Sequence, residues 1–404
     1  MTEAFCILIH YHEIALKGKN RSWFERRLIK NIKRQLSGLP FTKVQLNAAR
    51  IFCFGIDESM WNDYAQRLKK VMGIKHAILM TQVKDDIDIL KSVAAAQLKG
   101  LEFSSFRVSA RRQYKDFHLS SQEINIMVGQ HLQSTYLKPV KLKNADMDVV
   151  IELVKGMAYI GHERIYGFGG LPVKTSEQAI SMISSGIDSP VSSFEMLKRG
   201  VELTYVHFHS APATSRQSIQ NVEEILTVLA GFQIQCRVYM VPLLEIQQKI
   251  MADTPNKLWV ILFRRAMIKI ASMIAEQLDI PALISGESVG QVASQTLSNI
   301  RATADAADRP ILRPLAGLNK EDIIRIAEKI GTYEISIEPY DDCCSFFVPI
   351  HPETKADLEI VRKTEANIDF GEMFATALKD AEIKTFEHPD YVRKSINRLE
   401  KVSD

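Results

Sequence analysis

Hydrophobic residues in the first 165 positions follow helical and strand spacings in turn. One predicted helix covers residues 21–36, and its apolar face repeats every four positions at Phe24, Leu28, Ile32 and Leu36. Further strands are predicted at 4–10, 50–55, 76–83, 106–111, 147–154 and 156–162, and further helices at 61–72, 88–98 and 121–135. Helices and strands mixed in this order predict an α+β fold for this part of the chain.

A different pattern begins after the glycine- and proline-containing segment 167–172, which is typical of a linker. Beyond it, short apolar strands alternate with amphipathic helices. The strands are predicted at 179–184, 201–208, 234–241 and 281–285, and the helices at 190–199, 215–230 and 257–278. This alternation predicts an α/β domain with a doubly wound parallel sheet. Residues 350–404 are expected to form short helices.

The 404 residues are 46% hydrophobic and 25% charged, which is typical of a soluble globular protein of two or three domains. No apolar run approaches the roughly 18 residues of a membrane span. Polar His10 and His12 follow a very short apolar run, which is not the pattern of a signal peptide. The five cysteines include no Cys-x-x-Cys pair and are odd in number. We therefore expect a cytoplasmic protein with reduced thiols.

The net charge of +3 conceals a basic N-terminal region. Residues 17–34 hold eight cations against one anion, Glu25. The eight are Lys17, Lys19, Arg21, Arg26, Arg27, Lys30, Lys33 and Arg34, and a second patch comprises Arg107, Arg111, Arg112 and Lys115. A solvated helix face explains most isolated basic runs. Two such patches in one region favour the binding of a polyanion.

The predicted strand 179–184 runs directly into Ser184-Ser185-Gly186-Ile187-Asp188-Ser189-Pro190. Ser189 is a suitable N-cap and Pro190 suits the first helical position, so a helix is predicted to begin here. Backbone N–H groups and the helix dipole would then converge where an anionic phosphate fits, and Asp188 could hold a divalent metal. This is not the Walker loop, because no lysine follows the glycine. A plain turn is the alternative interpretation.

This loop resembles the pyrophosphatase loop of the N-type ATP-dependent ligases and thiolases. Three further segments narrow the resemblance: Gly286-Glu-Ser-Val-Gly-Gln-Val-Ala-Ser-Gln-Thr-Leu297, Arg313-Pro-Leu, and Asp341-Asp-Cys-Cys-Ser-Phe-Phe-Val-Pro349. Together with Glu13-Ile-Ala-Leu-Lys-Gly-Lys-Asn-Arg21, they resemble the tRNA 4-thiouridine synthetases of the ThiI family. The likeness extends from about residue 7 to about residue 350.

The resemblance implies a ferredoxin-like domain at 1–60, a THUMP domain that binds tRNA at 61–166, and a PP-loop ATP pyrophosphatase domain at 171–404. It implies that ATP, with Mg2+, adenylates O4 of the uridine at position eight of tRNA and releases pyrophosphate. A protein persulfide then supplies sulfur as AMP leaves. It further implies thiocarboxylation of a small sulfur-carrier protein for thiamine synthesis, and a homodimer.

The resemblance also assigns residues to the nucleotide site. They are Met182, Ile183, Ser184, Gly186, Asp188, Ser189, His207, Phe208, Arg264, Gly286 and Gln295. Asp188 is in addition expected to be catalytic, and the cations from Lys17 to Lys30 and from Arg107 to Lys115 are expected to bind tRNA. Met182 and Ile183 would otherwise be ordinary core residues. No metal-ligating set is predicted, because the sequence indicates no third ligand to join His207 and His209.

Cys343 and Cys344 are adjacent in a polar segment bounded by prolines. A buried structural thiol is the usual interpretation of a free cysteine. The resemblance instead implies that one of the pair carries the persulfide, with Cys344 preferred and Cys343 as the alternative. Asp341 and Asp342 should raise the pKa of a neighbouring thiol, unless they face Mg2+ or the uridine.

The chain departs from the family pattern at three places. Ser185 replaces a usual glycine; a positive φ there would cost on the order of 1 kcal/mol, whereas a negative φ would tolerate the serine and let its hydroxyl donate. His12 also stands where the family tends to have glycine. The chain ends at Asp404 without the rhodanese cysteine of longer members, so a separate cysteine desulfurase is expected to supply sulfur. The persulfide would be resolved by the other cysteine of the pair or by Cys236.

Two alternative functions stay open. One is a tRNA-binding protein with a degenerate ATP site, which Ser185 motivates. The other is a sulfurtransferase that acts on the carrier protein alone, which the basic patches argue against. A THUMP-linked methyltransferase is disfavoured, because the sequence has no glycine-rich cofactor loop and no Asn-Pro-Pro-Tyr tetrad.

Overall fold

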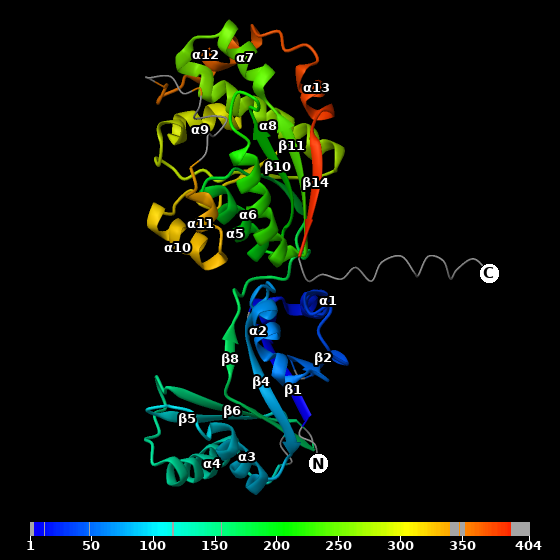
Figure 1. Ribbon diagram of the computed structural model, residues 1–404, viewed down its shortest axis with the longest axis vertical. Coiled ribbons are helices and arrows are strands. Elements are labelled where there is room, and N and C mark those ends of the chain that lie inside the picture. The colour runs from blue at the N-terminus through cyan, green and yellow to red at the C-terminus, as the bar shows by residue number, and fades with distance from the viewer. Residues whose placement is uncertain are drawn as a thin grey trace, which may run out of the picture. The chain divides into compact units, whose positions relative to one another are not determined.

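A computed structural model describes residues 4–11, 13–47, 49–114, 117–154, 156–339, 347 and 352–388. The chain divides into two compact units between Gly170 and Leu171, within the predicted linker (Figure 1). Each unit has its own sheet. Among the described residues, no helix is both long enough and apolar enough to cross a bilayer.

The first unit contains four helices and eight strands among the described residues. The helices are α1 (Arg21–Gln35), α2 (Trp61–Lys69), α3 (Ile87–Leu98) and α4 (Ser121–Tyr136). The strands are β1 (Ala4–Tyr11), β2 (Lys43–Asn47), β3 (Arg50–Phe54), β4 (Ile74–Lys84), β5 (Phe106–Arg112), β6 (Met147–Val154), β7 (Met157–Gly161) and β8 (Arg164–Tyr166). The mixed order confirms the predicted α+β class for this unit.

Strand β4 is the central strand of the sheet, whose order is β2-β3-β1-β4-β7-β6-β5. Along one edge β4 pairs with β1 over most of its length. Along the other edge it pairs first with β8 and then with β7 (Figure 1). The 11-residue strand therefore pairs with strands of both domains that are expected in this unit, the ferredoxin-like domain and the THUMP domain.

Three hydrophobic clusters hold this unit together. One packs α1 and α2 on β1 and β3, and a second packs α3 and α4 on β5 and β6. The third lies between the two ends of the sheet, where the rings of Phe52 and Tyr159 are 4.9 Å apart. Arg50 also forms an ion pair with buried Glu152 at 3.0 Å, although three strands separate β3 from β6 in the sheet. The sheet is therefore strongly curved, so that its two ends pack on each other.

The expected boundary between residues 60 and 61 stands directly in front of α2. The side chains of Trp61, Tyr64 and Leu68 on this helix are buried in the same cluster as β1 and α1. The core of the ferredoxin-like part thus continues beyond residue 60.

The second unit contains helices and strands in alternation. The helices are α5 (Asp188–Lys198), α6 (Gln217–Gln233), α7 (Leu244–Asp253), α8 (Trp259–Gln277), α9 (Leu297–Ala304), α10 (Lys320–Ile330), α11 (Tyr333–Ser336), α12 (Leu358–Ala366) and α13 (Met373–Lys379). The strands are β9 (Gln178–Met182), β10 (Glu202–His209), β11 (Gln235–Pro242), β12 (Leu283–Ile284), β13 (Ile311–Leu312) and β14 (Glu382–Glu387). Neighbours in the order β13-β12-β9-β10-β11 are parallel, as predicted for a doubly wound sheet.

Strand β14 corrects the expectation that residues 350–404 form only short helices. Helices α12 and α13 do form in this segment, but β14 pairs antiparallel with β11 at the edge of the sheet (Figure 1). Its sequence Glu-Ile-Lys-Thr-Phe-Glu contains β-branched and aromatic residues, which fit an edge strand. The prediction failed because a single short strand gives little periodic signal.

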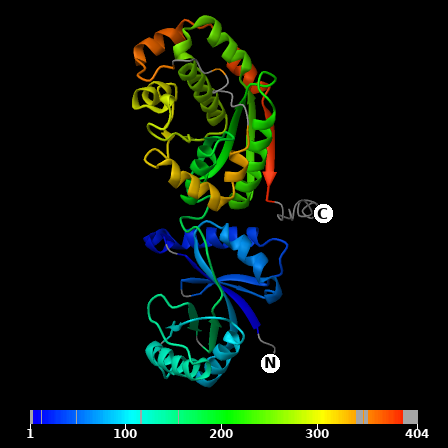
Figure 2. The same ribbon diagram turned by 60° about the vertical axis from the view of Figure 1, so that its left-hand side comes forward.

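Helices cover both faces of this sheet (Figures 1 and 2). Helices α5 and α6 contact β10 from one side, while α8, with α7 and α13 packed on it, contacts β9 and β12. The chain runs from β9 through β10 to β11 in one direction and then returns to β12 on the other side of β9. Ligands bind at such a switch point, outside the carboxyl ends of the strands.

Candidate functional site

The turn from β9 into α5 is the predicted phosphate loop. The helix begins at Asp188, so Ser189 is not the N-cap that the sequence predicts. Its hydroxyl oxygen instead accepts from the backbone N–H of Ser184 at 2.8 Å and donates to the Ser184 carbonyl at 3.0 Å. Pro190 lies in the first helical turn, where its missing N–H costs nothing. Ser189 therefore closes the loop back on the end of the strand.

Ser185 occupies its place in the loop without backbone strain. It is not among the residues with positive φ, so the destabilising alternative raised for this serine is wrong. The residue is 1% exposed, and its hydroxyl has no hydrogen-bond partner among the described residues. Buried polar groups are seldom left unpaired. Ser185 is not among the described residues that line the adjacent cavity, and its unstrained backbone gives no reason to regard the site as degenerate.

A cavity of about 410 Å3 opens at the switch point, next to this loop. All eleven residues assigned to the nucleotide site line it: Met182, Ile183, Ser184, Gly186, Asp188, Ser189, His207, Phe208, Arg264, Gly286 and Gln295. Among the described residues, seven more line it: Met267, Ile268, Ser285, Glu287, Gln291, Val292 and Ile311. The cavity thus combines an apolar side with polar and charged groups, as ligand sites commonly do.

His207 is a neutral hydrogen-bonding group in this wall. Burial, with a smaller effect of His209, lowers its pKa to about 4. Its Nδ1 lies 3.0 Å from the Ile183 carbonyl, and its Nε2 has no partner among the described residues. With the proton on Nδ1, Nε2 presents an acceptor. Among the described residues, no group of three or more His, Cys, Asp or Glu side chains is placed so that it could hold a metal ion.

Two glutamine side chains add further unpaired acceptors. The Oε1 atoms of Gln291 and Gln295 are buried and have no hydrogen-bond partner within the described part of the chain. Both residues line the cavity. Together with Nε2 of His207 they would suit a ligand that carries N–H or O–H donors beside an apolar ring.

Asp188 is held by two residues that sequence reasoning missed. Lys320, the first residue of α10, places Nζ 2.7 Å from Oδ1 of Asp188. Gln291 donates from Nε2 to Oδ2 at 2.8 Å. These partners lie 132 and 103 positions away in the sequence, so no local pattern could have identified them.

A second charged group in the wall of the cavity surrounds Glu287. Its carboxylate is ion-paired with Arg264 and with Arg313, and it accepts a hydrogen bond from Ser285. Burial acts to raise the pKa of Glu287, but the two guanidinium groups outweigh it and hold the pKa below its ordinary value. Glu287 is therefore anionic at neutral pH, although only 8% of it is exposed.

The predicted sulfur-bearing residues Cys343 and Cys344, like Asp341 and Asp342, lie outside the described residues. Cys236 is described, and its position argues against the resolving role considered for it. It is the second residue of β11, at the amino end of the strand, whereas the cavity lies at the carboxyl ends of the strands. Its side chain is fully buried. Burial raises its pKa to about 12, so almost no thiolate is present at neutral pH.

The basic residues of the first unit fall into two groups. Lys19, Arg26, Lys30 and Arg111 are exposed, and Lys17 and Arg27 are half-buried. The other three described cations are bound within the fold: Arg21 to Glu25 and Tyr11, Arg107 to Asp148, and Arg112 to the Phe117 carbonyl. Lys115 and His12 lie outside the described residues. Of the nine described cations predicted to bind tRNA, four are therefore exposed and three are bound to structural partners; Lys33 of the same basic patch is also exposed.

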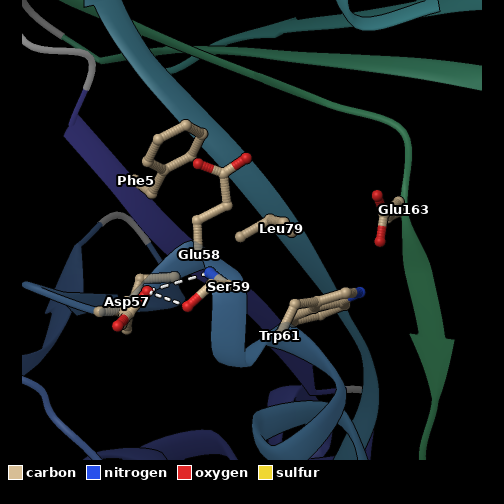
Figure 3. Close-up of a pocket in the computed structure, with 8 residues that line it drawn as sticks. Phe5, Asp57, Glu58, Ser59, Trp61, Leu79 and Glu163 are labelled. Carbon is tan, nitrogen blue, oxygen red and sulfur yellow. Dashed lines mark hydrogen bonds between the residues drawn. The ribbon is translucent and has the colours of Figure 1, made fainter.

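Another hollow, of about 680 Å3, lies in the first unit beside the start of α2 (Figure 3). Asp57, Glu58 and Glu163 line it, and Asp57 accepts hydrogen bonds from the N–H and hydroxyl groups of Ser59. A wall with three carboxylates repels phosphate. None of the predicted functional residues that the structure describes lines this hollow, so its larger volume does not make it the candidate site.

Comparison with known proteins places the chain in a family. Models of the "ThiI ferredoxin-like domain", the "THUMP domain" and the "Thiamine biosynthesis protein (ThiI)" match residues 6–77, 84–163 and 174–370. A "Probable tRNA sulfurtransferase" of Thermus thermophilus is 38% identical over 96% of this chain and 95% of its own length. This chain belongs to the ThiI family. A ThiI relative from Moorella thermoacetica with the same name is 40% identical over 94% of this chain and 97% of its own.

The fold agrees with that of a solved structure described as a 4-thiouridine synthetase–RNA complex with bound ATP. That chain is 35% identical, with a TM-score of 0.86 over 95% of this ThiI chain and all of the other. The resemblance seen in the sequence motifs is thereby confirmed, and so is the predicted fold class of the second unit.

Proposed function

We propose that this ThiI chain is an ATP-dependent tRNA sulfurtransferase that converts uridine to 4-thiouridine. The observation that carries the proposal is the convergence of all eleven expected nucleotide residues on one cavity at the switch point of the sheet. Family membership and the likeness to an ATP-bound 4-thiouridine synthetase–RNA complex support it. The strain-free Ser185 removes the observation that favoured a degenerate ATP site.

In this proposal the apolar wall and the unpaired acceptors receive adenosine, and the phosphate loop receives the phosphates. The adenine amino group and the ribose hydroxyls are the donors that Nε2 of His207 and Oε1 of Gln295 lack. Backbone N–H groups and the start of α5 would face the anionic end. Mg2+ is commonly held by one or two carboxylates and the substrate phosphates, and Asp188 fits that role. The ion would offset phosphate charge.

The chemistry follows from making a carbonyl oxygen a good leaving group. O4 of the uridine attacks the α-phosphate of ATP, and the bond to pyrophosphate breaks. The terminal sulfur of a cysteine persulfide then attacks C4, and AMP leaves with the oxygen. A second thiol attacks the cysteine sulfur of the resulting C4–S–S linkage, which releases 4-thiouridine and leaves a disulfide for an external thiol to reduce. We assign the persulfide to Cys344, with Cys343 as the alternative.

The tRNA would be held through its phosphates by the exposed cations of the first unit. Lys19, Arg26, Lys30 and Arg111 are the candidates that have open positions. Binding should weaken steeply with salt, because each phosphate contact releases counterions. Reversing the charge of Arg26 and Lys30 should lower both affinity and the salt slope, whereas Lys43→Glu, on an exposed site outside the patches, should change them little.

We further propose a cysteine desulfurase as sulfur donor, a homodimer, a cytoplasmic location, and a second activity on the sulfur-carrier protein of thiamine synthesis. The family's description as a thiamine biosynthesis protein supports the second activity. Charge reversal at Arg26, Arg27 and Lys30 distinguishes the two activities. It should abolish tRNA thiolation while leaving carrier thiocarboxylation intact; equal loss of both would contradict separate substrate surfaces.

The deciding experiment is nucleoside analysis of tRNA from cells that lack the gene. Wild type should restore 4-thiouridine, whereas Asp188→Ala and Cys344→Ser should not. Asp253→Ala, which removes a carboxylate paired with Lys249 outside the cavity, is the matched control and should restore it. In vitro, pyrophosphate release should require ATP and tRNA together. Failure of the wild-type protein to restore 4-thiouridine would refute the proposed function.

A further inference from the structure

Two neighbouring arginines on α8 have matching ion pairs but different positions. Arg264 lines the cavity and pairs with Glu287 at 2.7 Å. Arg265 is absent from the described lining of the cavity; it pairs with Asp305 at 3.1 Å and with Glu365 at 2.7 Å. One helix therefore carries a cavity-facing and a purely internal version of the same interaction.

The carboxylate of Glu287 is fully engaged. Oε1 accepts from Nη1 of Arg264, and Oε2 accepts from Nε of Arg313 at 2.6 Å and from the Ser285 hydroxyl at 2.8 Å. The side chain is only 10% exposed. It follows Gly286 directly after β12, so the backbone at the switch point fixes where this carboxylate lies.

The charges of this group do not cancel. Two guanidinium groups and one carboxylate leave a net charge of +1 behind the wall of the cavity. Nη2 of Arg313 is buried and has no partner among the described residues. Without the carboxylate, two partly buried cations, with side chains 24% and 17% exposed, would repel each other, and Arg264 would lose the anion that holds it in the wall. A polyphosphate is the kind of ligand that such an excess of positive charge favours.

We propose that Glu287 is a positioning residue that holds the guanidinium of Arg264 in the cavity wall, ready for the anionic part of a nucleoside triphosphate. The inference rests on the proposed function, because the triphosphate is the substrate named there. Glu287 does not touch the ligand in this proposal; it acts through Arg264. Its effect on nucleotide affinity must therefore disappear when Arg264 is replaced.

The test is a double-mutant cycle on ATP binding, measured by calorimetry on the full chain with Mg2+ present. Glu287→Gln should raise the Kd for ATP about tenfold. Arg264→Gln should raise it by at least as much, and the double variant should bind no more weakly than Arg264→Gln alone. The conservative variant Glu287→Asp should recover part of the affinity that Glu287→Gln loses. In turnover assays, Glu287→Gln should raise KM for ATP more than it lowers kcat.

The matched control is Glu365→Gln, which removes a carboxylate of similar burial, 11% exposed against 10% for Glu287, that pairs with the next residue of the same helix. It should lower the melting temperature as Glu287→Gln does but leave the Kd for ATP within twofold of wild type. A wild-type Kd in Glu287→Gln, an equal rise in Glu365→Gln, or independent losses in the double variant would overturn the inference. Absence of ATP binding by the wild-type protein would instead overturn the proposed function, and this inference with it.

Discussion

Gly286 is the position at which the smallest change should disturb the nucleotide site most. A Cβ atom added there would lie 2.9 Å from both Cα and the backbone N of Ser189, and 3.1 Å from the carbonyl carbon of Asp188. Ordinary contacts of a Cβ are 3.4–4 Å. In Gly286→Ala, the end of β12 and the phosphate loop must therefore separate by about half an ångström or more. The atoms in the way belong to the backbone, so no side-chain rotation relieves the contact.

Overpacking of this kind costs about 1–3 kcal/mol. If the strain is expressed only when the loop must close on ATP, the Kd for ATP rises by about 5- to 150-fold. If part of it is expressed in the free protein, the second unit melts about 2–4 °C lower for each kcal/mol. We expect both effects, because the contact is already present without ATP and lowers stability, and because the displaced loop then binds the phosphates less tightly.

Calorimetric titration with ATP and Mg2+ measures the change in the Kd for ATP, and thermal melting of the free protein measures the change in its stability. The matched control is Gly317→Ala, because a Cβ there meets nothing within 4 Å and the residue does not have a positive φ. It should bind ATP and melt as wild type does. Wild-type affinity and stability in Gly286→Ala would show that β12 and the loop are not rigidly apposed, and the reasoning would be refuted.

Three further predictions concern other parts of the chain. Burial and the neighbouring cations lower the pKa of His10 to about 3 and that of His76 to about 4. Since the unfolded chain binds protons near pH 6.5, the free energy of unfolding should fall as the pH drops from about 6.5 toward 4, by up to about 4 kcal/mol at pH 5 for the two histidines together. Replacing both histidines with glutamine should flatten this dependence in melting curves, and an unchanged slope would contradict it. Arg50→Met should lower the free energy of unfolding by about 3 kcal/mol in denaturant titrations, because it leaves the carboxylate of Glu152 buried without a counter-ion. Adding Glu152→Met should recover much of this loss. A further, additive loss in the double variant would contradict the stabilising role of the ion pair. Ser189→Ala should weaken ATP binding at least about fivefold with little change in melting temperature, because its hydroxyl closes the loop; equal affinity would show that the loop closes without it.

The predicted elements were correct where the local pattern was long or chemically distinct. The four-residue repeat from Phe24 to Leu36 appears as α1, and the strand–loop–helix around Gly186 appears as β9 and α5. The role of Ser189 was predicted wrongly because a serine before a proline fits an N-cap equally well whether its hydroxyl turns toward the helix or toward Ser184. Local sequence does not distinguish these two directions.

Residues that act through distant partners could not be predicted. Lys320 and Gln291 reach Asp188, and Arg313 reaches Glu287, only after the sheet has placed β9, β12 and β13 side by side. The family resemblance supplied Arg264 without indicating what orients it. The nucleotide residues were thus predictable as a set, while the ion pairs that hold them required the fold.

Because β4 carries backbone hydrogen bonds to β1 on one edge and to β8 and β7 on the other, no cut through the first unit leaves both pieces with a complete sheet. A fragment that starts after residue 84 would lack β4, the strand with which β7 pairs. A fragment that ends before residue 74 would also lack β4 and would leave one edge of β1 unpaired. The THUMP part therefore cannot be separated as a free-standing piece, and any fusion or truncation that keeps it intact must also keep the ferredoxin-like part.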